Sequence, residues 1–107
     1  MKKEDFCPIR DILDKVADKW SLLVLYPLRQ HEVMRFSELQ KAIPDISQKM
    51  LTQTLRRLED MSLISREAYP EVPPRVEYRL TKLGHSFMDN IEPLVGWAIE
   101  NRDQCLG

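Results

Sequence analysis

Hydrophobic positions at the start of the chain predict two helices. The first has apolar residues at the i, i+3, i+4 and i+7 spacing of an amphipathic helix, at Ile9, Ile12, Leu13 and Val16. The second, over residues 20–28, is apolar on almost every side, which is typical of a buried helix. Because proline removes a backbone donor, Pro27 is expected to make the second helix irregular over residues 23–30.

A short apolar run at residues 33–36 indicates a small strand, and a third helix follows it. Ser37 has the position of an N-cap and Gln40 lies three residues later, as in a capping box, so this helix is expected to start at about Glu38. Pro44 should end it near Ile43.

The fourth predicted helix carries one apolar face and one cationic face. Ser47 is its N-cap candidate, and it should run from Gln48 to about Met61 after only a brief turn. Leucines line one face of it, at Leu51, Leu55 and Leu58. The opposite face carries polar and cationic side chains with two flanking residues, namely Lys49, Gln53 and Arg56 with Thr52 and Arg57.

Two alternating runs then predict a β-ribbon followed by a last helix. The strands should cover residues 63–69 and 75–80, joined by a proline-rich stiff loop over residues 70–74. Thr81 can cap the last helix, and Pro93 should kink it. The order helix, turn, cationic helix and ribbon predicts a mainly α (α+β) winged helix-turn-helix with a two-stranded wing, in one domain spanning residues 1–107.

Charge is distributed unevenly along the chain. The net charge of −1 is unusual for a DNA-binding domain, but residues 47–58 hold three cations and no acid. Residues 82–107 hold two cations and four acids. The predicted recognition helix is therefore locally positive, and local potential is what a phosphate meets.

The cationic helix and its neighbours give a candidate set for duplex DNA. Amide groups at the start of the Ser47 helix can hold a phosphate. Glutamine side chains match adenine in the major groove, so Gln48 and Gln53 are expected at adenines. Lys and Arg side chains match guanine, so Lys49 and Arg56 are expected at guanines. Backbone contacts are expected from Arg57 and Lys41, and Arg75 lies at the wing, where a minor groove would be. The full set is Ser47, Gln48, Lys49, Thr52, Gln53, Arg56, Arg57, Arg75 and Lys41.

The rival reading is a winged-helix protein-interaction module whose cations only solubilise it. Such a module would show no preference for duplex DNA. An enzyme is not indicated, because no nucleophile, base and orienting group stand in a recognisable arrangement. Three glycines cannot form a phosphate-cradling loop, and the two histidines have no metal-ligand spacing to the cysteines, so no cofactor and no metal are expected.

The ends of the chain predict a homodimer in the cytoplasm. The start of the sequence lacks the apolar region of a secretory signal, and the longest apolar run, residues 22–26, is too short for a membrane. The last helix has more apolar surface than so small a domain can cover. Dimerisation elements are expected at about residues 8–18 and 82–105, with an interface of Ile9, Ile12, Leu13, Ile91, Leu94, Trp97 and Ile99.

Five motifs, in order, resemble the HxlR-type family of winged helix-turn-helix regulators. They are Cys7-Pro8, Lys19-Trp20, Arg35 to Leu39, Ile43 to Leu51 and Val72 to Gly84, and they span nearly the whole chain. The resemblance implies a homodimeric bacterial transcription regulator of MarR-like architecture. The chain departs from the family pattern at Asp18, where a Gly is usual, at Pro27, and at Ser62, where a Gly usually closes the recognition helix. If position 62 is left-handed, Ser costs roughly 1 kcal/mol relative to Gly.

The Cys7-Pro8 pair also resembles the thiol that some family members use to sense oxidants or electrophiles. A helix N-terminus favours a thiolate, and Cys105 of a second subunit could approach Cys7 in a dimer built from both terminal helices. The alternatives are that both thiols are inert, or that a small molecule in the dimer cleft is the effector.

Overall fold

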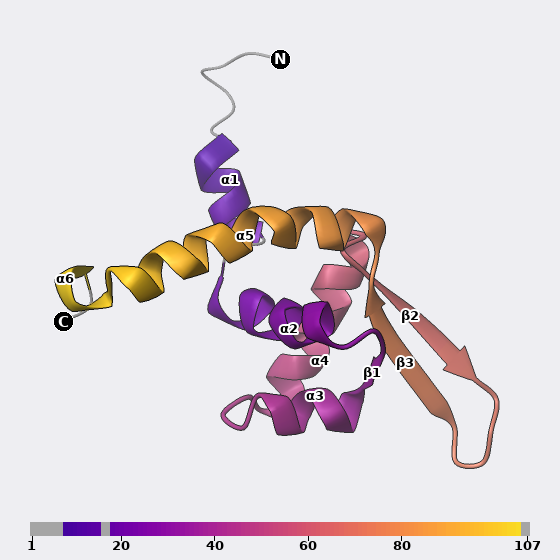
Figure 1. Ribbon diagram of the computed structural model, residues 1–107. Coiled ribbons are helices and arrows are strands. Elements are labelled where there is room, and N and C mark those ends of the chain that lie inside the picture. Colours follow the sequence, from indigo (N-terminus) through magenta and orange to yellow (C-terminus); the bar gives the residue numbers. More distant parts are fainter. Residues whose placement is uncertain (1–7, 16–17, 106–107) are drawn as a thin grey trace.

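The computed structural model describes residues 8–15 and 18–105 (Figure 1). Along the chain the elements are α1 (Pro8–Lys15), α2 (Lys19–Gln30), β1 (Met34–Arg35), α3 (Phe36–Ala42), α4 (Gln48–Asp60), β2 (Ile64–Tyr69), β3 (Arg75–Leu80), α5 (Lys82–Glu100) and α6 (Arg102–Cys105). The predicted winged helix-turn-helix of mainly α (α+β) class is confirmed.

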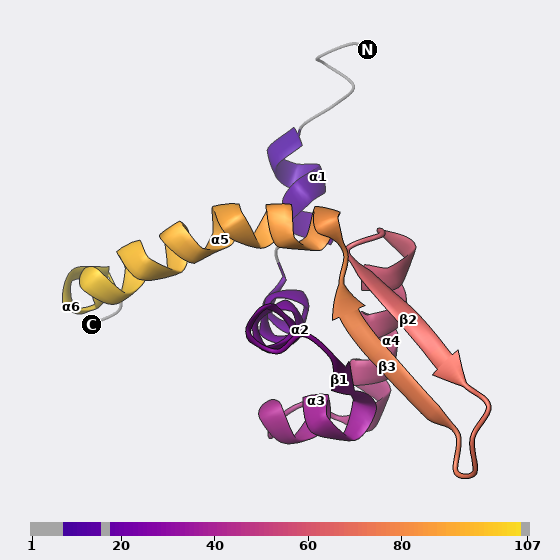
Figure 2. The same cartoon turned by 45° about the vertical axis from the view of Figure 1, so that its right-hand side comes forward.

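The body of the molecule forms around α2, which lies between α5 on one side and α3 on the other, with α4 beside it (Figures 1 and 2). Side chains from these helices and from β2 share one core, which includes Leu25, Leu39, Leu51, Ile64 and Met88. α5 crosses one end of this body and extends past it, away from the wing (Figure 2).

α2 corrects the expectation for Pro27. The helix runs unbroken from Lys19 to Gln30, with the Pro27 ring buried inside it. His31, the C-cap residue, still makes a helical hydrogen bond, because its N–H donates to the Pro27 carbonyl at 2.9 Å. Burial of the neighbouring Val24 and Leu28 offsets the one backbone bond that proline removes.

α3 begins two residues before its predicted start, so the assignment of Ser37 as N-cap is wrong. Arg35 occupies the N-cap position, and Glu38 supplies the cap by accepting the Arg35 N–H at 2.8 Å. A carboxylate in the first turn also interacts favourably with the helix dipole. The predicted small strand is β1, whose Met34 pairs with Tyr78 of β3.

α4 begins as the sequence predicts. The Ser47 hydroxyl accepts the Met50 N–H at 3.0 Å, which caps the helix. Leu51, Leu55 and Leu58 are buried, as their spacing requires. Ser62, just past the end of α4, has φ 63°, so this position is left-handed and the cost of a Ser there applies.

The sheet has the order β1-β3-β2 and is antiparallel throughout. The predicted two-stranded wing is the β2–β3 hairpin, with register from Ile64 opposite Leu80 to Tyr69 opposite Arg75. The Val72–Pro73 peptide in the connecting loop is cis. The wing projects from the body beyond α3 and α4 (Figure 1).

α5 is a 19-residue helix capped by Thr81, whose hydroxyl accepts the Gly84 N–H at 3.0 Å. It bends along its length, but no break occurs at Pro93 (Figures 1 and 2). Gly84 lies against the chain entering β2. A Cβ atom at position 84 would stand 2.1 Å from the Leu63 carbonyl oxygen, so only glycine fits there.

Candidate nucleic-acid interface

The outer face of α4 presents the predicted contact set to solvent. Gln48, Lys49, Thr52, Gln53 and Arg56 are all exposed, while the opposite face is locked into the core. The Thr52 hydroxyl donates to the Gln48 carbonyl at 2.8 Å, so its hydroxyl hydrogen is already used within the helix. The amide side chains and the cations on this face are the groups available to a ligand.

The start of α4 is a suitable place for an anion. Ser47 is exposed and satisfies one of the first four amide donors of the helix, the Met50 N–H. Lys49 lies in the first turn, and Lys41 is exposed near the end of α3. Within residues 8–15 and 18–105, no carboxylate comes within 4.0 Å of the charged nitrogen of Lys41, Lys49 or Arg56.

Arg57 is directed toward α2 rather than toward the outer face. Its Nη2 donates to Asp18 Oδ2 at 2.9 Å and to Ser21 Oγ at 3.0 Å. Asp18 is at the same time the N-cap of α2, since its Oδ1 accepts the Ser21 N–H at 2.8 Å. These bonds show a packing role for Arg57 that the sequence did not predict, because they join the recognition helix to the start of α2.

Arg75 lies at the loop end of the wing, where its charge is largely compensated. It forms ion pairs with Glu71 at 3.1 Å and Glu77 at 3.5 Å, and its guanidinium stands 4.2 Å from the Tyr69 ring centre. The Tyr69 hydroxyl donates to Glu67 at 2.8 Å, and this bond raises the pKa of the phenol. The wing end is therefore ordered by its own charges.

The sequence reading missed Arg66, which lies on β2 and faces α4. Arg66 and Arg56 line one hollow between the recognition helix and the wing, with a volume of about 220 Å³. We call this space the wing hollow; it is lined by Phe36, Thr52, Leu55, Arg56, Glu59, Arg66 and Tyr78. Arg66 lies two residues after Ile64 and two before Ala68, so strand alternation places it on the same side as these apolar residues. A cation among apolar residues on one side of a strand is the signal that could have identified it.

The side chains expected at a dimer interface are exposed on α1 and α5. Ile9 is 70% exposed, and Leu94, Trp97 and Ile99 are 60%, 55% and 59% exposed. Ile91 instead packs partly against the core. The side chains of Ile12 and Leu13 lie outside what the structure describes.

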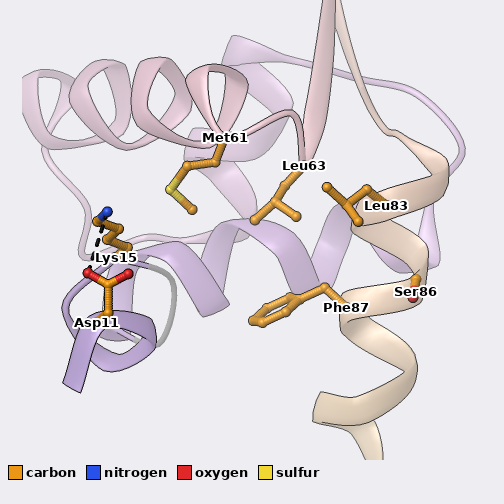
Figure 3. Close-up of a pocket in the computed structure, with 7 residues that line it drawn as sticks. All are labelled: Asp11, Lys15, Met61, Leu63, Leu83, Ser86 and Phe87. Carbon is orange, nitrogen blue, oxygen red and sulfur yellow. Dashed lines mark ion pairs between the residues drawn. The ribbon is translucent and has the colours of Figure 1, made fainter. Parts of the chain in front are cut away.

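An apolar groove of about 380 Å³ runs between α1, the end of α4 and the start of α5 (Figure 3). Met61, Leu63, Leu83 and Phe87 supply its apolar walls, and Ser86 lies beside Phe87. Asp11 and Lys15 of α1 form an ion pair of 3.5 Å at its opposite edge. The groove joins both terminal helices to the end of the recognition helix.

Of the two cysteines, Cys105 is a free, exposed thiol on α6. Cys7 lies outside the described residues, so the predicted approach of the two thiols stays a prediction. Within the described ranges, no group of three His, Cys, Asp or Glu side chains is placed to hold a metal ion. None of the helices in the described part of the chain is both long and apolar enough to span a membrane.

Comparison with known proteins gives consistent matches along nearly the whole chain. Residues 15–105 match the HxlR-like helix-turn-helix family. An HTH-type transcriptional regulator from Methanothermobacter thermautotrophicus is 47% identical over 95 residues, which cover 89% of this chain and 72% of the relative.

Solved structures of similar proteins agree with the fold. A MarR-family transcriptional regulator from Porphyromonas gingivalis is 40% identical with a TM-score of 0.80, covering 94% of this chain and 96% of the other. The redox regulator HypR in its oxidized form is 36% identical with a TM-score of 0.81, covering 89% and 97%. The relatives are transcriptional regulators, which are not enzymes.

Proposed function

Because the chain belongs to the HxlR-like helix-turn-helix family, we propose that it is a transcriptional regulator that binds a palindromic DNA operator as a homodimer. The observation that carries this proposal is the two-faced recognition helix. Its leucine face is buried, while Lys49, Gln53 and Arg56 are exposed, and among the described residues no carboxylate lies within 4.0 Å of the charged nitrogens of Lys49 and Arg56. A groove of duplex DNA offers the acceptors that these side chains need.

Two recognition helices are needed to read a palindrome. We propose that α1 and α5 supply the two-fold interface through Ile9, Leu94, Trp97 and Ile99, whose exposed apolar surface is left uncovered in the single chain. The whole chain of 107 residues then acts as one domain, with its dimerisation elements at both ends. Dimerisation would set the recognition helices about 34 Å apart, which is one turn of duplex.

Within this proposal, Gln48, Lys49 and Gln53 face base edges in the major groove, and the amide groups after Ser47 hold a phosphate. Lys41 and Arg75 contribute backbone contacts from the two sides of the site. Arg57 acts mainly by holding α4 against Asp18 and Ser21.

Selection from a random duplex pool tests the proposal and gives the operator. Enrichment of one palindromic sequence is the expected result, with affinity that falls as salt rises by a log–log slope of about −0.9 per phosphate neutralised. A Lys49→Ala variant should lose about 1–3 kcal/mol on the selected site and relax its preference there. If the selection enriches no sequence, as expected for a protein-interaction module, the proposal is overturned.

A second element of the proposed function is control by thiol oxidation. It is favoured by the similarity to the redox regulator HypR and by the exposed Cys105 thiol. We propose that oxidation joins Cys7 of one subunit to Cys105 of the other and alters the spacing of the recognition helices.

Diamide treatment tests this thiol proposal. It should abolish operator binding of the wild type and produce a disulfide-linked dimer on a non-reducing gel. Cys7→Ser should bind the operator in the presence of diamide. If Cys7→Ser loses binding as the wild type does, these thiols are not the switch.

A further inference from the structure

Arg66 is the one cation on the α4-facing side of the wing within the described residues. In the sheet register it lies opposite Tyr78, and Ile64 lies opposite Leu80. Ile64, Tyr78 and Leu80 are buried in the core, so this side of the hairpin faces the body. Arg66 therefore extends from the core-facing side of β2, at the point where the sheet passes the edge of α4.

Arg56 meets the same space from the recognition helix. It lies one turn beyond Thr52, and both side chains line the wing hollow together with Arg66. Two arginines thus line one space from two different elements. Neither Arg56 nor Arg66 has a carboxylate within 4.0 Å in the part of the chain that the structure describes.

Charge balance in the wing hollow indicates an anion. Arg56 and Arg66 carry two positive charges, and Glu59 is the one acid among the lining residues. One added negative charge would bring the hollow to neutrality. Guanidinium groups bind phosphate oxygens through paired N–H bonds, and the hollow volume of about 220 Å³ leaves room for a phosphate group.

We propose that Arg56 and Arg66 together hold one backbone phosphate of the operator between the recognition helix and the wing. This inference rests on the proposed DNA binding and refines it. Arg56 then belongs with the backbone contacts that fix the position of the protein on the duplex, whereas the sequence reading expected it at a guanine. Gln53 and Lys49, which lie one and two turns before Arg56 on α4, remain the residues proposed to contact base edges.

A thermodynamic cycle between protein and DNA tests the proposal. Operator duplexes are prepared with a neutral methylphosphonate at one backbone position at a time, and binding is measured for wild type, Arg56→Gln and Arg66→Gln. Each variant should bind the unmodified operator about tenfold more weakly and lower the salt slope by about one. At one shared position, the methylphosphonate should weaken wild type strongly and cause a clearly smaller further loss in each variant, because each variant keeps only one of the two arginines on that phosphate.

Arg79→Gln is the matched control. Arg79 lies on the neighbouring strand, opposite Ser65, so it stands on the other side of the same hairpin. It should change affinity less than twofold and show no coupling to any phosphate. Thermal unfolding of all three variants should match wild type, since Arg56 and Arg66 are exposed and Arg79 is partly exposed.

Any one of four results would overturn the inference. Arg56→Gln and Arg66→Gln could couple to different phosphates, Arg56→Gln could relax the preference at one base pair, or Arg66→Gln could behave like Arg79→Gln. Inorganic phosphate that binds at the two arginines and does not compete with the duplex would identify a free-anion site and also overturn it. A wild type that binds no duplex selectively overturns the proposed function itself, whereas selective binding without a shared phosphate overturns this inference alone.

Discussion

α4 and α5 are both amphipathic helices, but α4 buries its leucine face within the chain, whereas α5 buries only part of its apolar face. Leu51, Leu55 and Leu58 of α4 are at most 2% exposed. On α5, Leu94 and Trp97 are 60% and 55% exposed. The leucine face of the recognition helix is thus buried in the core, whereas the far half of α5 leaves its apolar side chains exposed, as the proposed dimer interface requires.

The two halves of α5 differ in the same way. In the first half, Gly84 and Met88 are buried against the body. Arg29 of α2 adds a polar link there, because its guanidinium bonds to Asp89, to Glu92 at 3.1 Å and to the His85 carbonyl at 3.0 Å. The hydrogen bond to Asp89, more than any other contact, raises the pKa of Arg29. Beyond Glu92 this anchoring ends, and Leu94, Val95, Trp97 and Ile99 are all exposed.

The largest expected effect separates the two helices directly. Leu51→Ala should lower the free energy of unfolding by about 2–5 kcal/mol, because it leaves a cavity in a fully buried site. Leu94→Ala should leave the unfolding of the single chain nearly unchanged and weaken the dimer instead. Chemical denaturation measures the first, and sedimentation equilibrium measures the second.

The Leu94→Ala variant can also contradict the proposed difference between α4 and α5. If Leu94→Ala lowers single-chain stability as much as Leu51→Ala does, then α5 is covered by its own chain. If wild type stays monomeric at micromolar concentration, the exposed face of α5 is not a dimer interface.

A middle-sized effect is expected at the bonds that hold α4 to α2. Asp18→Ala removes the α2 N-cap and the partner of Arg57 together, so it should cost about 1–2 kcal/mol of stability. It should also weaken operator binding, because α4 loses the hydrogen bond between Arg57 and Asp18 that holds it against α2. Thermal unfolding and operator titration measure the two effects.

Lys19→Ala is the control for Asp18→Ala. The Lys19–Asp45 pair is 3.8 Å long with both side chains more than half exposed, and its loss should change stability by less than about 0.5 kcal/mol. If both substitutions lower the stability equally, the hydrogen bonds of Asp18 contribute no more than the exposed Lys19–Asp45 ion pair.

The smallest effect lies at the end of α4. Ser62 has φ 63°, so Ser62→Gly should stabilise the fold by about 1 kcal/mol. Ser65→Gly, in the extended β2 strand, should destabilise it instead. A Ser62→Gly variant that unfolds at a lower temperature than wild type would show that the Ser62 side chain makes a compensating contact.

Local patterns predicted the elements and the cap of α4, because leucine spacing and the Ser47 N-cap act within a few residues. The start of α3 was predicted wrongly because two caps competed there, and the Glu38 carboxylate, not Ser37, took that role. Contacts between distant parts of the chain could not be read in this way. Arg57 meets Asp18 across 39 positions, and no periodicity indicates which of several cations on α4 turns inward.

The close contact between Gly84 and the Leu63 carbonyl fixes the position of α5 near its start, so a change in the direction of α5 would be largest at its far end. Gly84 is the third residue of the 19-residue helix, so about 24 Å of α5 lie beyond it, and a tilt of about 10° at Gly84 would displace the far end by about 4 Å. That displacement exceeds the rise of about 3.4 Å per base pair along duplex DNA. In the proposed dimer, the direction in which α5 leaves Gly84 would therefore determine operator spacing to within a base pair or two, far from any residue that touches DNA.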